Sequence, residues 1–419
     1  MRCDSPLSLL LELQGQKHPF CLYSSGLDAF SYLGANPQKI CKVYPRHLEI
    51  QGQRRELKKG EDPFSLLEKE FDLKGKQNNF FKSGWVGFWA YEMGQFSDEK
   101  FPQRDLPEDC LLAWWAYYDS IWVWDHFQQK FLHEGSPVPQ SQKDNLNSEW
   151  NPPPYRLDEA RYLSAVERVL AYIRAGDCYQ VNIAQMFKWE LDKDFSPIQE
   201  FVKLVNKHPA PFAAYLDCGS KKIISLSPEE LLWMEGDKLR TTPIKGTRHR
   251  SSNPIDDEKI KNELANSEKE KAELLMIVDL ERNDLGKICE TASVRVSNLR
   301  KIVSFDYVHH ALATIEGKKK QGLTALEATR SMFPGGSITG APKKRAMEII
   351  QELESEARGV YTGAIGFYAK GEVCHLNIAI RSLEIDGNRA KFGMGSGIVA
   401  DSQPLDEFQE ILTKSKVFR

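Results

Sequence analysis

Three β-strands are predicted in succession near the C-terminus, at VYTGAIGFYA (residues 360–369), HLNIAIRSLEI (375–385) and AKFGMGSGIVA (390–400). Each is short, apolar and bounded by turn residues. A helix, KKRAMEIIQELE (343–354), precedes this run, and another helix closes the chain. Because strands arrive in runs and do not alternate strictly with helices, the pattern favours an α+β fold with large antiparallel or mixed sheets.

The middle of the chain mixes the same two kinds of element. A helical pattern, LDEARYLSAVERVLAYIRAGD (157–177), is followed by the alternating pattern of a strand, CYQVNIAQMFKWEL (178–191). A strand pair, KKIISLS (221–227) and KLRTTPI (238–244), then leads into a long helix at about 267–285.

A linker is predicted at residues 133–156, which are rich in Pro, Ser, Asn and Gln and poor in apolar periodicity. Residues 1–132 before it carry strand patterns at FCLYSS, WVGFWAYEM and LLAWWAYYDSIWVW. Their dense aromatic side chains are expected in a sheet core. The chain is therefore expected in three parts: a sheet-rich region at 1–132, the linker, and residues 157–419.

The composition narrows the classes of partner. The 419 residues carry a net charge of −3 with mixed signs, so no basic stripe favours nucleic acid or an anionic membrane surface. No apolar run approaches the ~20 residues of a membrane span, and the N-terminus does not resemble a signal peptide. The eight cysteines lie singly, without CxxC pairs, which favours reduced thiols in the cytoplasm. A small molecule or another protein is the expected partner.

Lys245 is the first candidate functional residue, because it lies in the apolar segment PIKGTR (243–248) immediately before a glycine. Two interpretations are open. Pro and Gly punctuate turns, so Lys245 can be a solvated turn residue. Alternatively, it can lie in a restricted pocket where its amine acts as a nucleophile.

Acidic residues share apolar faces on two predicted helices. In SEKEKAELLMIVDLERNDLG (267–286), helical spacing aligns Glu270, Glu273, Leu274, Ile277, Leu280 and Glu281. In PLDEFQEILTKSKVF (404–418), it aligns Glu407, Glu410, Ile411 and Lys414. If the helices meet, four carboxylates surround a hard divalent cation such as Mg²⁺, which prefers carboxylates, water and an anionic substrate. The alternative is that Glu270 reaches water and that Glu273 pairs with Arg282 or Arg345.

Three further features have both structural and functional interpretations. The loop FPGGSITGAPKK (333–344) lacks the spacing of a nucleotide-binding loop, so it is either a carboxylate-binding loop or a tight turn entering a helix. His309 and His310 are buried structural histidines or acid/base groups. Arg381, in the predicted strand IAIRSL, is a salt-bridge partner or a clamp on a substrate carboxylate.

Several of these motifs, taken in order, resemble the chorismate-utilising enzymes: GDCYQVNIAQ, ISLSPEELL, PIKGTR, KAELLMIVDLERNDLG, FPGGSITGAPKKRAMEII, YTGAIGF, IAIRSL and GSGIVADSQP followed by EFQE. The match runs from about residue 160 to 417. SGWVGFWAYEM (83–93) resembles the N-terminal region of anthranilate and aminodeoxychorismate synthases. The resemblance implies an anthranilate-synthase-like layered sandwich of two large, mainly antiparallel sheets flanked by helices. Residues 157–419 would form the chorismate-binding catalytic region.

Within the family, PIKGT resembles component I of aminodeoxychorismate synthase, whereas anthranilate synthases resemble PIAGT. The resemblance implies that Lys245 is a nucleophile toward C2 of chorismate, that Glu229 is the general acid/base, and that His310 lies near the ring. The product would be 4-amino-4-deoxychorismate, a precursor of 4-aminobenzoate and folate. The rivals are an anthranilate synthase component I and a noncatalytic binder of chorismate or tryptophan.

The resemblance also assigns ligands. Glu273 and Glu410 match metal ligands, with Glu270 and Glu407 as water-bridged neighbours of Mg²⁺. The positions that match chorismate contacts are Thr339, Gly340, Tyr361, Arg381, Gly395 and Lys414. The implied partners are chorismate, ammonia and a separate glutaminase subunit that supplies the ammonia. A looser match at SSGLDAFSYLG (24–34) makes tryptophan a further expected ligand.

Overall fold

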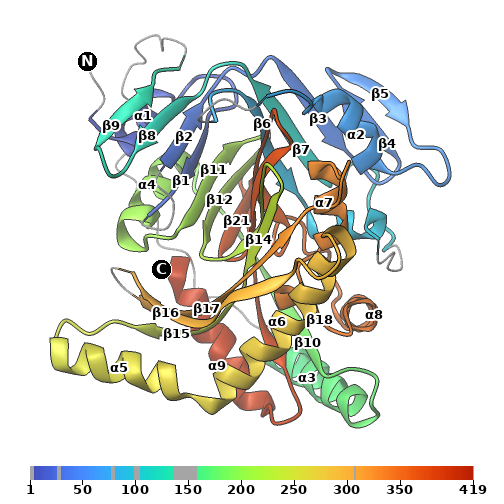
Figure 1. Ribbon diagram of the computed structural model, residues 1–419, viewed down its shortest axis with the longest axis vertical. Helices are drawn as coiled ribbons and strands as arrows, with labels where there is room; N and C mark the ends of the chain where they lie inside the picture. The colour runs from blue at the N-terminus through green and yellow to red at the C-terminus, as the bar shows by residue number, and fades with distance from the viewer. Residues whose placement is uncertain are drawn as a thin grey trace.

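The computed structural model describes residues 4–25, 30–76, 81–98, 104–135, 158–305 and 308–418. Most of the predicted linker, residues 136–156, lies outside this part of the chain. Within it, the strands form two large sheets with helices around them (Figure 1). Every pairing between described strands is antiparallel.

The first sheet contains ten of the described strands. Their order across the sheet is β18 (Gly340–Ala341), β10 (Gln180–Glu190), β22 (Arg389–Ile398), β21 (Ser382–Asp386), β12 (Lys221–Ser227), β11 (Phe212–Asp217), β1 (Phe20–Tyr23), β2 (Phe30–Gly34), β8 (Trp122–Asp125) and β9 (Lys130–His133).

The second sheet contains twelve of the described strands. Their order is β15 (Ile244–His249), β17 (Val308–Lys318), β14 (Lys238–Thr242), β13 (Glu230–Glu235), β20 (Val373–Ile378), β19 (Ala364–Ala369), β6 (Gly84–Trp89), β7 (Ala113–Tyr118), β3 (Lys39–Val43), β4 (His47–Ile50) and β5 (Gln53–Glu56), with β16 (Arg295–Ser304) paired to β17.

Both sheets combine strands from before and after the predicted linker. In the first sheet β1 pairs with β11, and in the second β6 pairs with β19. One hydrophobic cluster joins the facing sides of the two sheets, with Phe20, Leu216 and Ile223 from the first and Val86 and Ile365 from the second. The sheets therefore form a sandwich with a shared core.

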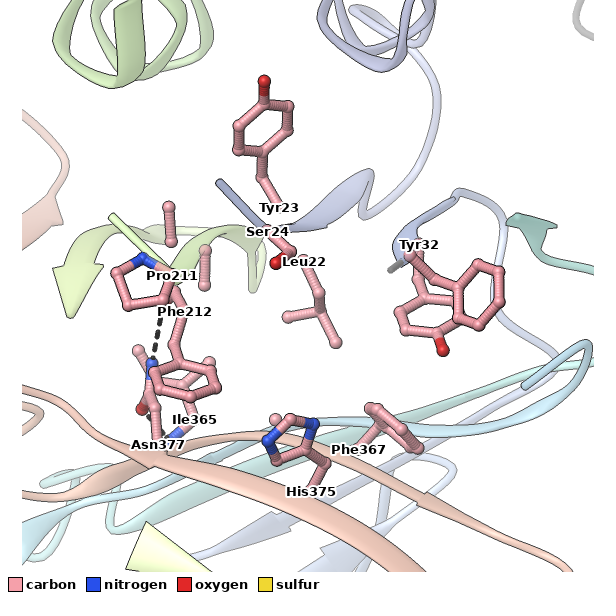
Figure 2. A pocket seen from close by; sticks show the side chains of 14 residues that line it. Leu22, Tyr23, Ser24, Tyr32, Pro211, Phe212, Ile365, Phe367, His375 and Asn377 are labelled. Carbon is pink, nitrogen blue, oxygen red and sulfur yellow. Dashed lines mark hydrogen bonds between the residues drawn. The ribbon is translucent and has the colours of Figure 1, made fainter. Parts of the chain in front are cut away.

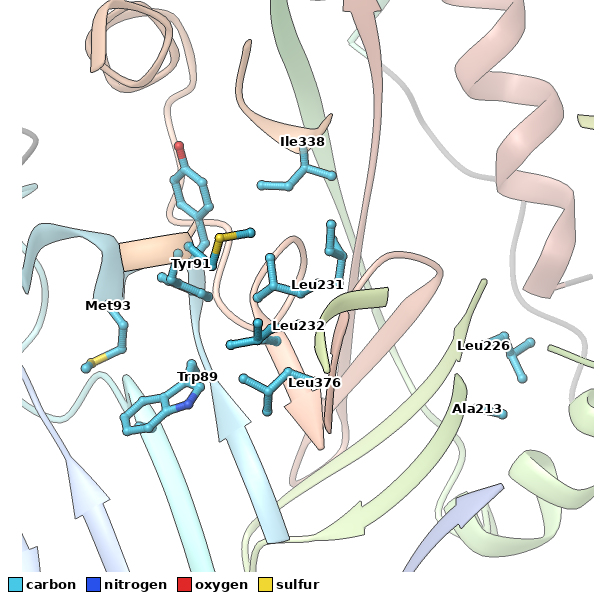
Figure 3. Packing of buried hydrophobic residues seen from close by; sticks show 14 of the residues in the cluster. Trp89, Tyr91, Met93, Ala213, Leu226, Leu231, Leu232, Ile338 and Leu376 are labelled. Atoms are coloured by element: carbon cyan, nitrogen blue, oxygen red, sulfur yellow. The ribbon is translucent and has the colours of Figure 1, made fainter. Parts of the chain in front are cut away.

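Helices cover the outer faces of the sandwich and one of its ends. A second cluster, shown in part in Figure 3, packs Trp89, Leu232 and Leu376 of the second sheet together with Ile338 of a loop. The predicted aromatic core is confirmed, since Trp114 and Trp115 are fully buried.

The described helices are α1 (Pro6–Glu12), α2 (Pro63–Phe71), α3 (Glu159–Arg174), α4 (Pro197–Lys207), α5 (Pro254–Asn266), α6 (Glu268–Ile288), α7 (Ala325–Met332), α8 (Lys343–Leu353) and α9 (Pro404–Ser415), with 3₁₀ turns η1 (Tyr91–Phe96), η2 (Gly336–Ile338) and η3 (Lys416–Phe418).

Two of the points where the chain crosses between the sheets are neighbours. One crossing leads from β12 to β13 through Glu229, and the other leads from β20 to β21 through Arg381. Backbone hydrogen bonds join them: Ile378 N donates to Glu229 O at 3.0 Å, and Leu226 N donates to Arg381 O at 2.9 Å. Two candidate site residues thus lie where the sheets are tied together.

The second crossing corrects the prediction of one strand at 375–385. The structure has two strands there, one in each sheet, because Arg381 adopts a left-handed backbone conformation with φ +52°. A non-glycine residue rarely adopts this conformation, so the sequence carries no signal for it. The strand predicted at 85–93 was also too long, since it ends at Trp89 and η1 follows.

Candidate active site

Lys245 extends from β15 toward the first sheet. Its side chain is 17% exposed, and its Nζ lies 4.0 Å from Glu273 Oε2 on α6. A Cβ atom placed on Gly397 of β22 would lie only 3.3 Å from the same Nζ. The interpretation of Lys245 as a solvated turn residue is therefore wrong, and its amine is enclosed between α6 and β22.

Gly246 allows α6 to lie close to this strand. Its φ is +90°, and a Cβ at this position would approach Glu270 Oε2 to 2.6 Å. A side chain here would be strained and would also displace the carboxylate. Close packing against α6 therefore explains why a glycine follows Lys245.

Glu229 is a buried carboxyl beside Lys245. Its exposed fraction is 4%, and Ile244 N donates to Oε1 at 3.4 Å. Burial raises the pKa of Glu229 to about 7, although the Ser337 hydroxyl and the Lys245 cation oppose the rise. Near neutral pH this group can hold or release a proton, as a general acid must.

His310 lies on β17, opposite Thr247 of β15, the strand that carries Lys245. Its Nδ1 is 2.8 Å from Thr247 Oγ1, and the ring is buried. Burial, followed by the Arg381 cation, lowers the pKa of His310 to about 3. The imidazole is therefore neutral near pH 7. In this form it can donate or accept a hydrogen bond, but it cannot act as a positively charged proton donor.

Arg381 is a half-buried cation, and within the described residues its guanidinium forms no hydrogen bond or ion pair. Desolvation lowers its pKa, yet an arginine stays charged at any physiological pH. A desolvated cation requires an anionic partner, and a bidentate carboxylate suits guanidinium best. No carboxylate of the described residues pairs with Arg381, so the salt-bridge interpretation lacks a partner. A carboxylate of a bound ligand is the better explanation for this cation.

We expect an Arg381→Met variant to bind chorismate, the substrate that the resemblance implies, about 10- to 100-fold more weakly, because a charge-assisted hydrogen-bonded pair is lost. Isothermal titration of the wild type and the variant measures the change. Arg389→Met is the matched control, since Arg389 is an exposed arginine on β22. Equal affinities of wild type and Arg381→Met would contradict the clamp.

The two acidic helices meet near Lys245. Burial raises the pKa of Glu273 on α6; the cations of Lys245 and Lys269 oppose the rise, and the nearby carboxylates of Glu410 and Glu407 on α9 add to it. Arg282 pairs with Asp279, and Arg345 pairs with Asp177 and Glu348, so neither arginine neutralises Glu273.

The four acids differ in their partners. Glu270 accepts from Arg248 at 2.7 Å, and its Oε2 is buried without a hydrogen bond. Glu407 accepts from Ser402 at 2.7 Å, and Glu410 pairs with Lys414 at 2.5 Å. In the described part of the chain, no three acidic, His or Cys side chains lie close enough together to hold a metal ion.

The donor set nevertheless suits Mg²⁺. This ion keeps several waters and uses one or two protein carboxylates together with substrate oxygens. Glu273 and Glu410 are hard oxygen donors on the two helices, and a cation between them would relieve the unfavourable effect of Glu410 on the ionised form of Glu273.

The expected substrate contacts lie around β22 and the glycine-rich loop. Lys414 donates to Gly395 O at 3.2 Å, and the Tyr361 ring packs against β22, where a Cβ on Gly393 would lie 2.3 Å from it. Thr339 donates its hydroxyl to Gly335 O at 2.8 Å, which fixes the loop. Gly340 leaves no room for a side chain, since a Cβ would lie 2.1 Å from Gln180 O.

Two residues that shape the site were not predicted from the sequence. Ser337 in the loop lies near Glu229 and lowers the pKa of that carboxyl, although its buried hydroxyl forms no well-aligned hydrogen bond within the described residues. The fully buried Arg358 donates to Ile338 O at 2.9 Å and Asn182 O at 2.8 Å, which joins the loop to β10. Ser337 lies inside the motif FPGGSITGAPKK, which the sequence did single out. For Arg358 there was no such signal, because no local pattern distinguishes a buried bridging arginine from a surface one.

A separate cavity lies between the two sheets (Figure 2). Phe212, Phe367 and Tyr32 give it aromatic walls, and Ser24 and Asn377 give it polar atoms. Asn377 is already engaged, since it donates to Phe212 O at 3.0 Å. Part of the stretch matched to a tryptophan segment therefore lines a cavity, while residues 26–29 lie outside the described residues.

Comparison with known proteins identifies the family of the chain. The family model described as chorismate binding enzyme matches residues 18–419. The chain belongs to this family. The chorismate-binding enzyme described here is 32% identical to "Aminodeoxychorismate synthase component 1" of Bacillus subtilis, over 96% of this chain and 91% of the relative. It is 34% identical to "Anthranilate synthase component 1" of Archaeoglobus fulgidus, over 99% and 97%.

The fold of the chorismate-binding enzyme is also confirmed. The structure of anthranilate synthase component I from Streptococcus pneumoniae superposes with a TM-score of 0.79 at 28% identity, covering 99% of this chain and 97% of that one. Among its described helices, none combines the length and apolar character that a membrane crossing requires. The relatives therefore establish the family and the layered α+β sandwich, and they include both kinds of synthase.

Proposed function

We propose that the chain is the ammonia-using synthase subunit that converts chorismate to 4-amino-4-deoxychorismate, as component I of an aminodeoxychorismate synthase. The observation that carries this proposal is the enclosed amine of Lys245, 4.0 Å from Glu273 and beside Glu229. The resemblance of PIKGT to the aminodeoxychorismate synthase pattern also supports the proposal, because the anthranilate synthase pattern PIAGT has an alanine there, which offers no nucleophile.

In the proposed reaction, Lys245 reacts as the free amine: its nitrogen forms a bond to C2 of the chorismate ring and releases one proton to water, which returns it at the end of the cycle. The ring double bonds shift, the C4–O bond breaks, and Glu229 protonates the hydroxyl, which leaves as water. Ammonia then bonds to C4, the double bonds shift back, and the C2–N bond breaks as Lys245 regains its proton. A proton from the new ammonium group returns to Glu229. The sum is chorismate plus ammonia giving 4-amino-4-deoxychorismate plus water.

Glu273 and Glu410 would hold Mg²⁺, with Glu270 and Glu407 as outer neighbours. When bound, the ion would neutralise a substrate carboxylate. Arg381 would hold a carboxylate, while the neutral His310 would donate or accept a hydrogen bond near the ring. These assignments place every charge of the substrate opposite a cation.

We expect a Glu410→Gln variant to need at least about tenfold more Mg²⁺ for half-maximal activity, because a charged oxygen ligand becomes neutral. A magnesium titration of turnover measures this requirement. Asp406→Asn is the matched control, since Asp406 is an exposed acid on the same helix. Unchanged magnesium dependence of Glu410→Gln would exclude Glu410 as a ligand.

The product distinguishes the proposal from its rival, anthranilate synthase component I. The protein is incubated with chorismate, Mg²⁺ and ammonium at alkaline pH, which supplies free ammonia, and a 4-amino-4-deoxychorismate lyase is then added. Formation of 4-aminobenzoate supports the proposal. Anthranilate as the only product would reject it, and no product at all would favour a noncatalytic binder.

The proposal includes partners. A separate glutaminase would supply ammonia, in keeping with the "component 1" names of the relatives. Tryptophan is the proposed ligand of the cavity between the sheets, where aromatic walls suit an indole. The proposed compartment is the cytoplasm, in keeping with seven described cysteines that are all free thiols.

A further inference from the structure

Glu281 is a third acid on the stripe of α6, and the proposed reaction does not use it. It lies two helical turns beyond Glu273, and its exposed fraction is 1%. Its Oε1 accepts a hydrogen bond from Gly336 N at 2.9 Å, in the loop that carries Ser337 and Thr339. A Cβ on Gly336 would approach Leu280 Cδ2 to 2.5 Å, so the loop is pressed against α6 at this point.

The second oxygen of Glu281 has no partner within the described residues. Oε2 is buried and makes no hydrogen bond. A buried carboxylate oxygen that receives neither a hydrogen bond nor a cation is costly, whereas a protonated carboxyl removes most of that cost. The geometry therefore favours a neutral, protonated Glu281 that still accepts from Gly336 through Oε1.

The charges around Glu281 agree with this state. Lys343 of α8 forms a buried ion pair with Asp284 of α6, so the nearby cation is already neutralised. Glu229 faces the same region from the crossing between β12 and β13. Burial raises the pKa of Glu281 to about 8; Asp284 and Glu229 add to the rise, and Lys343 and the Gly336 N–H oppose it.

We propose that Glu281 is a positioning residue, which in its uncharged form fixes the glycine-rich loop so that Ser337 faces Glu229 and Thr339 lies beside the substrate. Ionisation of Glu281 would place a second negative charge next to Glu229 and leave an unsolvated oxygen under the loop. Substrate binding should therefore weaken as Glu281 loses its proton. This inference rests on the proposed function only for the identity of the substrate.

Thermal stability tests the protonation state without any substrate. In the unfolded chain Glu281 ionises near its ordinary pKa, but in the folded protein it keeps its proton to about pH 8. The stability that this carboxyl contributes is therefore fully present below about pH 4.5 and is lost as the pH rises through 8. A Glu281→Gln variant is free of this loss, so its Tm relative to wild type should rise between pH 5.5 and 8.5.

The matched control for this experiment is Glu268→Gln, on the same helix, where the carboxylate side chain is 82% exposed. Its Tm difference from wild type should not change with pH. If the difference for Glu281→Gln is equally flat, Glu281 is ionised in the folded protein and the proposal is overturned.

Chorismate binding tests the positioning role. At pH 7, Glu281→Gln should bind chorismate within about twofold of wild type, because the amide oxygen still accepts from Gly336, whereas Glu281→Leu should bind at least about tenfold more weakly. Between pH 7 and 9 the wild type should lose affinity and Glu281→Gln should lose less. Equal binding by Glu281→Leu, or identical pH profiles of wild type and Glu281→Gln, would contradict the role. A wild type that binds no chorismate would reject the proposed function, while the Tm measurement would still decide whether Glu281 is protonated.

Discussion

A Lys245→Ala variant should lose at least about 10³-fold of the turnover of chorismate to 4-amino-4-deoxychorismate, because removal of a covalent nucleophile abolishes the route that depends on it. Its affinity for chorismate should change by less than about tenfold, since Arg381 and Lys414 remain. Turnover is measured with saturating ammonium, and binding by isothermal titration. The expected pattern is therefore a loss in kcat and not in binding.

Two further variants separate nucleophilicity from charge. Lys245→Arg keeps a cation beside Glu273 but offers no nucleophile, so it should be as inactive as the alanine variant. Lys269→Ala removes the other lysine near this carboxylate, 4.0 Å from Glu273 Oε1 and 65% exposed, and should keep nearly full activity. Substantial turnover by Lys245→Arg would show that Lys245 acts only through its charge.

A Glu229→Gln variant should lose about 10²- to 10⁴-fold of kcat, the range that general acid catalysis contributes. The amide keeps the hydrogen bond from Ile244 N but cannot supply a proton to the departing hydroxyl. Because burial raises the pKa of Glu229 to about 7, the wild-type carboxyl is protonated below that pH and loses its proton above it. At constant free ammonia, the wild-type rate should therefore fall as the pH rises through 7.

The residual activity of Glu229→Gln should lack this decline. Glu235→Gln, which changes an exposed acid at the end of β13, is the control and should keep the wild-type profile. A wild-type rate that stays level from pH 6 to 8.5 at constant free ammonia would remove Glu229 as the acid.

Local periodicity predicted many of the individual elements. The strand predicted at KKIISLS matches β12, and the helical pattern at 157–177 contains α3. The α+β class and the two antiparallel sheets are also confirmed. These features depend on patterns of two to four residues, which a single sequence displays directly.

The arrangement of the elements could not be obtained in this way. The stretch 375–385 reads as one strand, yet the chain changes sheets inside it, because the left-handed backbone at Arg381 turns β21 away from β20. The hairpin of β16 and β17, on which His310 lies, was not recognised as strands. Such features depend on tertiary contacts, which override local propensity.

The candidate site shows the same division. Spacing and resemblance selected Lys245, Glu229 and Glu273, and the structure brings these three together. The sequence could align Glu281 with Glu273 on one face, but it could not tell that Glu281 is buried under a loop. Helical spacing placed four carboxylates together, but it could not show that each already has a partner: Arg248 for Glu270, Ser402 for Glu407, Lys414 for Glu410 and Lys245 for Glu273.

The most direct measurement for the whole account is the intact mass of the protein after incubation with chorismate and Mg²⁺ in the absence of ammonia, followed by rapid acid quenching and peptide mapping. We predict a fraction of the protein with the added mass of chorismate less one water, carried by the peptide that contains Lys245 and absent from Lys245→Ala. An unmodified wild-type protein that still forms 4-amino-4-deoxychorismate when ammonia is supplied would contradict the covalent mechanism.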